Sequence, residues 1–241
     1  MIKIEVCVDS VEDALLAQQS GADRLEISAV LEVGGTTPSI GIIKHIKEVV
    51  NIPIMPLIRE RCGNFSYSKT EKVTMLKSIE SLLLEGCNGF VIGALTRSGD
   101  IDFDFMQEIN KSFPGVDVTF HRAFDFCNDP LKQIIRLEEL GIKRILTSGQ
   151  ANDIIKGASL IKELIKNSSS INIMPGGGIT PENVKQLVEI TQASEIHTSA
   201  SDIYTYDIEY DTKELGMGEL TKRKRFSSKR FNEIKASIQG E

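Results

Sequence analysis

Short runs of β-branched and aliphatic residues recur along the first 200 positions of the chain, and a longer amphipathic segment follows each run. The runs return about every 25–30 residues, which is the spacing of strand–helix units. The predicted strands are Ile2–Val8, Arg24–Ser28, Ile52–Ile58, Gly89–Ile92, Val116–His121, Arg144–Thr147, Ile171–Met174 and Glu195–Thr198. The predicted helices are Val11–Gln19, Ile40–Val50, Lys69–Leu84, Phe103–Lys111, Pro130–Leu140, Asp153–Ile165 and Pro181–Ile190.

Regular alternation of strands and helices indicates right-handed crossovers and a parallel sheet. Eight such units in about 200 residues are typical of a closed (β/α)₈ TIM barrel. A doubly wound open sheet is the alternative, but it would more often have a glycine-rich turn where this chain reads CVDS after the first strand. We therefore predict an α/β protein with a single barrel over residues 1–203. A short basic extension over 204–241 is expected to be partly helical or flexible.

Polar residues occupy one face of several predicted strands. In the first strand Ile4, Val6 and Val8 share the face that packs under the helices, so Glu5 and Cys7 should point into the barrel. The same alternation directs Glu26, His121 and His197 inward. Buried carboxylates need partners, and polar groups at the carboxyl ends of barrel strands are usually functional. A purely structural interior, in which Glu5, Glu26 and Arg59 satisfy one another, is the open alternative.

Three loops that follow predicted strands have the composition of anion sites, because glycine lets backbone N–H groups converge. They contain Ser148-Gly149, Gly176-Gly177-Gly178 and Ser199. The competing interpretation is a set of tight turns that need positive φ.

The segment TFHRAFD adds candidate acid–base chemistry at the end of the fifth strand. His121 can exchange protons near neutral pH, and Arg122 or Arg59 can bind a carboxylate or phosphate with two hydrogen bonds. Asp125 is expected to orient His121 or to cap the next loop.

Composition narrows the function classes. The chain has 241 residues and a formal net charge of −6, which argues against nucleic-acid binding as its main role. No apolar run is long enough for a membrane span, and the N-terminus does not resemble a signal peptide. Four cysteines without a CxxC pair indicate free thiols in a cytoplasmic protein. Residues 212–241 have a local excess of basic over acidic side chains. A short final helix in this part is expected to cover the last gap of the barrel.

Barrel closure would make the first and eighth strands neighbours, which brings Cys7 and His197 together. A thiolate and an imidazole suit Cu(I) or Zn(II). No local metal-ligand spacing accompanies the pair.

The stretches GADRLEIS, GGTTPSIG, TFHRAFD, RILTSGQ and EIHTSAS resemble the CutC family, and the likeness runs from about Glu5 to Ser201. The resemblance implies a (β/α)₈ barrel, a cytoplasmic location and a role in copper homeostasis with Cu(I) binding. The matching polar positions are Glu5, Glu26, Arg59, His121, Arg122, Asp125, Ser148, Gly149, Glu195, His197 and Ser199.

Two functions follow as hypotheses: copper homeostasis through Cu(I) binding, and acid–base catalysis on a small phosphorylated or carboxylated metabolite. The metal candidates are Cys7 and His197, and the catalytic candidates are Glu5, Glu26, His121, Asp125 and His197. The candidates for binding an anion are Arg59, Arg122, Ser148, Gly149, Gly176, Gly177, Gly178 and Ser199. The expected partners are a small anionic ligand and, in a homodimer, a second copy of the chain; no membrane partner is expected.

Overall fold

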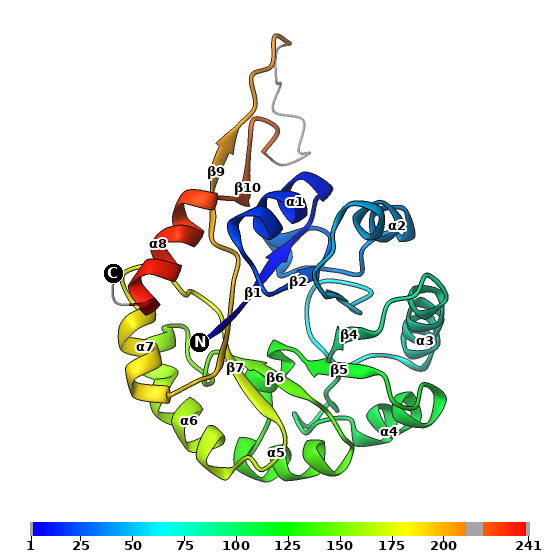
Figure 1. The fold of residues 1–241 in the computed structure, drawn as a ribbon. Helices are drawn as coiled ribbons and strands as arrows, with labels where there is room; N and C mark the ends of the chain where they lie inside the picture. The colour runs from blue at the N-terminus through cyan, green and yellow to red at the C-terminus, as the bar shows by residue number, and fades with distance from the viewer. Residues whose placement is uncertain (1, 211–218, 240–241) are drawn as a thin grey trace.

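The molecule is a closed ring of eight parallel strands surrounded by helices (Figure 1). The computed structural model describes residues 2–210 and 219–239. The barrel strands are β1 (Lys3–Val8), β2 (Arg24–Ile27), β3 (Ile54–Pro56), β4 (Gly89–Ile92), β5 (Asp117–Phe120), β6 (Arg144–Thr147), β7 (Asn172–Pro175) and β8 (Glu195–Thr198). They form the orders β3-β2-β1-β8 and β4-β5-β6-β7, and the bridges Leu57–Val91 and Gly176–His197 join the two halves. The predicted barrel is confirmed.

Seven helices connect the strands on the outside of the ring. They are α1 (Val11–Ser20), α2 (Ile40–Val49), α3 (Lys69–Leu84), α4 (Phe103–Ser112), α5 (Pro130–Glu139), α6 (Ile154–Asn167) and α7 (Val184–Thr191). Side-chain oxygens of Ser10, Ser39 and Ser68 accept N–H groups of the first turns of α1, α2 and α3. Among the described residues, no helix has both the length and the apolar character needed to cross a bilayer.

The seventh helix begins later than the sequence pattern predicts. The Asn183 side chain accepts the Thr180 N–H at 2.8 Å and donates to the Gly178 carbonyl, also at 2.8 Å. These two bonds hold residues 180–183 in a turn, so α7 starts at Val184 rather than at Pro181.

Apolar packing is concentrated between the strands and the helices, not inside the barrel. The main core includes Ile4, Val6 and Val8 of β1, all nearly inaccessible to solvent. Within the described chain, the separate apolar cluster of the interior contains only Met55, Leu57 and Val91. The strands therefore leave much of the interior to polar side chains, as their alternation predicts.

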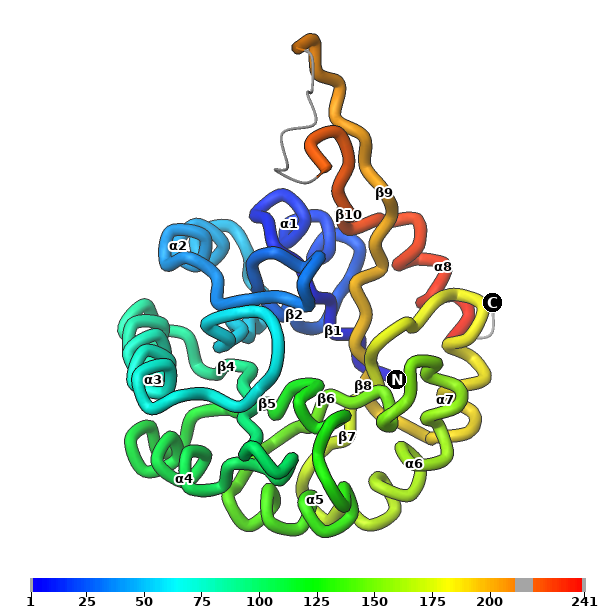
Figure 2. Tube along the Cα trace, turned by 180° about the vertical axis from the view of Figure 1, so that it is seen from behind, coloured from blue at the N-terminus to red at the C-terminus, as the bar shows by residue number. Residues whose placement is uncertain are grey.

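The C-terminal extension combines a projecting ribbon with a covering helix. Strands β9 (Ser201–Thr205) and β10 (Lys222–Phe226) pair antiparallel and stand out from the rim (Figure 2). Helix α8 (Ser228–Gln239) packs against α1 and α7 and covers the gap between them. The expected barrel boundary at residue 203 falls inside β9, and part of the expected flexible segment, 211–218 and 240–241, lies outside the described residues.

Two arginines of β10 have acidic partners on the barrel side. Arg223 pairs with Asp9, and Arg225 pairs with Asp13 at 2.8 Å. The ion pairs hold β10 against α1, so the basic ribbon is docked on the barrel.

Phe231 tests the contribution of the docked helix. Its ring is fully buried and lies 5.7 Å from that of Phe226. We expect Phe231→Ala to lower the free energy of unfolding by about 3–5 kcal/mol in urea denaturation, because it leaves a cavity that the surroundings fill only partly. Asn232→Ala, at an exposed position of the same helix, should change it by less than about 0.5 kcal/mol. Equal small effects of both variants would show that α8 contributes little to stability.

Candidate functional site

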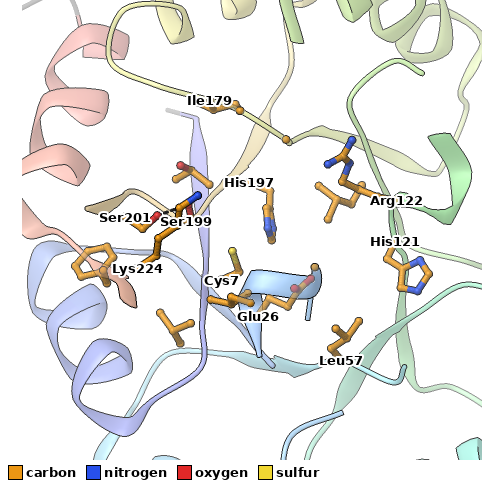
Figure 3. Close-up of a pocket in the computed structure, with 18 of the residues that line it drawn as sticks. Cys7, Glu26, Leu57, His121, Arg122, Ile179, His197, Ser199, Ser201 and Lys224 are labelled. Carbon is orange, nitrogen blue, oxygen red and sulfur yellow. Dashed lines mark hydrogen bonds between the residues drawn. The ribbon is translucent and has the colours of Figure 1, made fainter. Parts of the chain in front are cut away.

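A cavity of about 300 Å³ opens at the carboxyl ends of the barrel strands (Figure 3), where barrel enzymes carry their active sites. We call it the mouth cavity. Its floor is formed by Cys7, Glu26 and His197. Arg122 lies on one side, next to Gly177, and Ser199, Ser201 and Lys224 lie on the other.

The floor is set by strand register. Glu5 of β1 lies beside His197 of β8, and Cys7 of β1 lies beside Glu26 of β2. One atom each of Glu5, Glu26 and His197 lie within 4.8 Å of one another. The sequence brings these side chains together, as predicted.

Glu5 is the most heavily paired of these groups. Its carboxylate accepts from Arg24 Nε through one oxygen and from His197 Nδ1 at 2.7 Å through the other. Burial alone would raise the pKa of Glu5, but the hydrogen bonds and positive charges of His197 and Arg24 lower it to about 2. Glu5 is therefore ionised at neutral pH.

Arg24 links Glu5 to a second buried acid. Its Nη2 lies 2.6 Å from Glu195 Oε2, and Asn172 Nδ2 donates to the other Glu195 oxygen at 2.9 Å. Arg24 shares the inward parity of Glu26 on β2, so the alternation of that strand could have identified it. The expected structural role of Arg59 as partner to these acids is wrong, because Arg24 takes that place.

His197 presents its second ring nitrogen to the cavity. Since Glu5 is ionised, Nδ1 carries the hydrogen of the 2.7 Å bond. Burial opposes protonation of the imidazole, but interactions with Cys7, Glu5 and Glu26 raise its pKa well above the usual value. The Cys7 sulfur points toward the ring (Figure 3).

Glu26 differs from Glu5 because Arg24 gives it no hydrogen bond. Burial raises the pKa of Glu26 to about 7; His197 opposes the rise and Glu5 reinforces it. A carboxyl that holds its proton near neutrality therefore faces the mouth cavity.

His121 lies in the cavity wall, but its environment does not suit the predicted acid–base role. The Ala123 N–H donates to Nδ1 at 3.1 Å, and the ring packs against Phe65 at 5.0 Å. Burial, with a smaller effect of Arg59, lowers the pKa of His121 to about 3. The imidazole is therefore neutral and a weak base.

The Arg59 guanidinium is hydrogen-bonded to loop carbonyls and is not free to bind a ligand through Nη1 or Nη2. Its Nη1 donates to the carbonyls of Val33 at 2.9 Å and Gly35 at 2.7 Å, and its Nη2 donates to Gly63 at 3.0 Å. These bonds join the loops after β2 and β3 at the edge of the cavity. The predicted anion role of Arg59 is wrong for these two nitrogens, because carbonyls occupy them.

Asp125 holds a loop and does not orient His121. Its carboxylate accepts from the backbone N–H of Ser148 at 2.9 Å, from the Ser148 hydroxyl at 2.9 Å and from Arg122 Nε at 2.7 Å. The Gly149 amide is likewise used internally, donating to Thr147 Oγ1 at 2.9 Å. Asp125 as a catalytic group and Ser148 and Gly149 as ligand donors are therefore corrected to loop-positioning roles.

The glycine loop, Gly176–Gly178, contributes partly to the sheet and partly to the cavity lining. The Gly176 amide donates to the Thr147 carbonyl at 2.9 Å, so Gly176 belongs to the sheet and not to the predicted anion site. Gly177 and Gly178 adopt positive φ and line the mouth cavity with Ser199. Lys224 was missed as a site residue, because no local pattern shows that β10 returns to the rim.

Comparisons with known proteins show the family of the chain and agree with its barrel fold. The family model described as the CutC family matches residues 2–202. A family protein CutC of Pasteurella multocida (strain Pm70) is 42% identical over 219 residues, covering 90% of this chain and 89% of the relative. The human copper homeostasis protein cutC homolog is 41% identical over 216 residues, covering 89% and 79%. The solved structure of CutC from Streptococcus agalactiae has a TM-score of 0.79 at 33% identity and covers 83% of this chain and 99% of that one.

Glu26 predicts a pH dependence of stability. Because its pKa of about 7 in the folded state exceeds the usual 4.5, its contribution to stability is full below pH 4.5 and is lost as the pH rises through 7. Glu26→Gln mimics the protonated carboxyl and does not lose this contribution. The difference in unfolding free energy between Glu26→Gln and wild type should therefore shift in favour of the variant by up to about 3 kcal/mol from pH 5 to pH 8.

Urea denaturation at both pH values measures this change. The matched control is Glu12→Gln at an exposed position of α1, which should follow wild type at both. Parallel pH profiles for wild type and Glu26→Gln would contradict the raised pKa.

Proposed function

Because this chain belongs to the CutC family, we propose that it serves copper homeostasis by binding Cu(I) between Cys7 Sγ and His197 Nε2. The human relative carries copper homeostasis in its name. The observation that carries the proposal for this chain is the 2.7 Å bond from His197 Nδ1 to Glu5, which leaves the other ring nitrogen beside the Cys7 thiol.

The donor set fits a soft monovalent ion. Thiolate sulfur and imidazole nitrogen are ligands that Cu(I) accepts. Metal-binding histidines commonly donate their other N–H to a carboxylate, which fixes the tautomer and the ring orientation. Glu5 supplies that carboxylate, and Arg24 holds Glu5 in turn.

The other thiols do not suit the ion. Burial raises the pKa of Cys127 to about 12 and also raises that of Cys87, which disfavours the thiolate needed for coordination. Cys87 lines a different cavity at the amino ends of the strands, and Cys62 is exposed. All four cysteines are free, which supports a cytoplasmic, reducing environment as part of the proposal.

Anaerobic Cu(I) titration against a chromophoric chelator tests the proposal. Cys7→Ser should abolish binding, whereas the exposed control Cys62→Ser should bind like wild type. Glu5→Gln should weaken binding by about 10–100-fold, because the orienting carboxylate is lost. Equal Cu(I) affinity in wild type and Cys7→Ser would remove Cys7 as a ligand and overturn the proposal.

Acid–base catalysis on a small phosphorylated or carboxylated metabolite is the second candidate function. Glu26 favours it, because a carboxyl with a pKa of about 7 can give and take a proton at neutral pH. Its neighbour His197 would carry the complementary charge.

A thermal-shift screen of such metabolites, followed by product analysis, tests this second candidate. A substrate should stabilise both wild type and Glu26→Gln, while the variant converts it about 10²–10⁴-fold more slowly. Equal turnover by both proteins would exclude Glu26 as the acid–base group.

A further inference from the structure

We propose that the mouth cavity binds a small organic anion, a carboxylate or phosphate compound, between Arg122 on one side and Lys224 on the other. The site deepens the second candidate function, because it names the side chains that would bind such an anion; it requires neither the metal nor catalysis.

The charge of the cavity contrasts with that of the whole protein. The chain carries −6 overall, yet the mouth cavity is lined by four Lys and Arg side chains and only two acids. Within the described residues Arg225 is neutralised by Asp13, and Arg59 is occupied by carbonyls. Arg122 is also ion-paired, with Asp125, but its Nη1 stays free, and Lys224 has no ion-pair partner among the described residues. These two are the groups that a ligand can reach, and a concave site with cationic groups concentrates anions.

Arg122 is held in place by two of its three side-chain nitrogens. Its Nε donates to Asp125 at 2.7 Å and its Nη2 donates to Ser148 Oγ at 3.0 Å, which fixes the guanidinium. In the described part of the chain, Nη1 has no hydrogen-bond partner. The side chain is 44% exposed, so this remaining donor is open to a ligand.

The glycine loop makes room for this guanidinium. A Cβ at Gly177 would lie 2.9 Å from both Cζ and Nη1 of Arg122, so a side chain there would displace it. A Cβ at Gly178 would meet nothing within 4 Å, so the cavity is open at this next position of the loop. Neither the Gly177 nor the Gly178 amide donates a hydrogen bond within residues 2–210 and 219–239.

Lys224, on strand β10 of the docked ribbon, supplies the cation on the opposite side of the cavity. The neighbouring Arg223 and Arg225 are tied to Asp9 and Asp13, which fixes the backbone of β10. Lys224 itself has no ion-pair partner among the described residues, and its side chain extends toward Ser199 (Figure 3). Lys222 has the same strand parity but lies farther out and does not line the cavity.

The space between the two cations defines the ligand class. A cavity of about 300 Å³ is at the small end of metabolite sites. The Ser199 and Ser201 hydroxyls, 3.1 Å apart, add hydrogen-bonding groups near Lys224. A compound with an acidic group at each end, such as a phosphorylated carboxylic acid, would contact both cations and pass over Cys7 and His197.

Cys7 offers a direct probe of the site in copper-free protein. Iodoacetate and iodoacetamide both alkylate a thiolate, forming a sulfur–carbon bond as iodide leaves, but only iodoacetate is an anion. We expect the ratio of the iodoacetate rate to the iodoacetamide rate to be about tenfold higher at Cys7 than at the exposed Cys62, because the cavity concentrates the anion. Peptide mass spectrometry reads both cysteines in one sample.

Substitutions of single cationic residues distinguish a specific anion site from a general electrostatic attraction by the surface. Lys224→Gln and Arg122→Gln should each lower the ratio at Cys7 severalfold, whereas Lys222→Gln should leave it unchanged. Added 3-phosphoglycerate should protect Cys7 saturably, and glycerol should not. Equal ratios at Cys7 and Cys62, or equal effects of Lys222→Gln and Lys224→Gln, would overturn the proposal.

If Cys7 reacts with neither reagent, a second measurement tests the proposal. The thermal midpoint of copper-free protein should rise with 3-phosphoglycerate in wild type and in Lys222→Gln, and the rise should be lost in Lys224→Gln. No rise in wild type would then overturn the anion site. The result leaves the Cu(I) titration untouched, so the two proposals fail separately.

Discussion

The buried carboxylate of Glu5, held between Arg24 and His197, is the interaction on which the arrangement of the site depends. A charge taken out of water costs several kcal/mol unless good partners surround it, and removing one partner of such a pair typically costs about 3–5 kcal/mol. Here the partners come from β2 and β8, the two strands that flank β1. The same contacts that satisfy Glu5 therefore fix the register of three strands and the orientation of the His197 ring.

The position of Cys7 follows from this constraint. Cys7 lies two residues after Glu5 on β1, so strand alternation puts its sulfur on the same inward face, one step closer to the mouth. Glu26 lies beside it on β2 but without the hydrogen bond from Arg24 that Glu5 accepts. Two neighbouring carboxyls thus receive opposite pKa shifts, to about 2 and about 7, because only one of them is hydrogen-bonded to both cations.

The sequence was sufficient for features governed by local periodicity. Alternation along the strands correctly placed Glu5, Glu26 and His197 together, and would have placed Arg24 with them had its parity been followed. Arg59 and His121 show where such reasoning stops, since the loop carbonyls around one and the buried surroundings of the other arise from tertiary packing. Lys224 is a stronger case, because its place at the rim depends on Arg223 and Arg225 meeting acids more than 200 positions earlier in the chain.

Copper and an organic anion can occupy the mouth cavity together, because different charged groups bind each of them. Arg24 pairs with the Glu5 charge, and a Cys7 thiolate would match the single charge of Cu(I); His197 would keep its Nδ1 bond to Glu5 and release the Nε2 proton on binding the ion. Neither pairing involves Arg122 or Lys224, which lie on the two sides of the cavity above the floor. Occupation of the floor by Cu(I) would therefore leave the free Arg122 Nη1 and the Lys224 ammonium available, and the attraction for an anion would persist in the copper-bound protein as in the copper-free one.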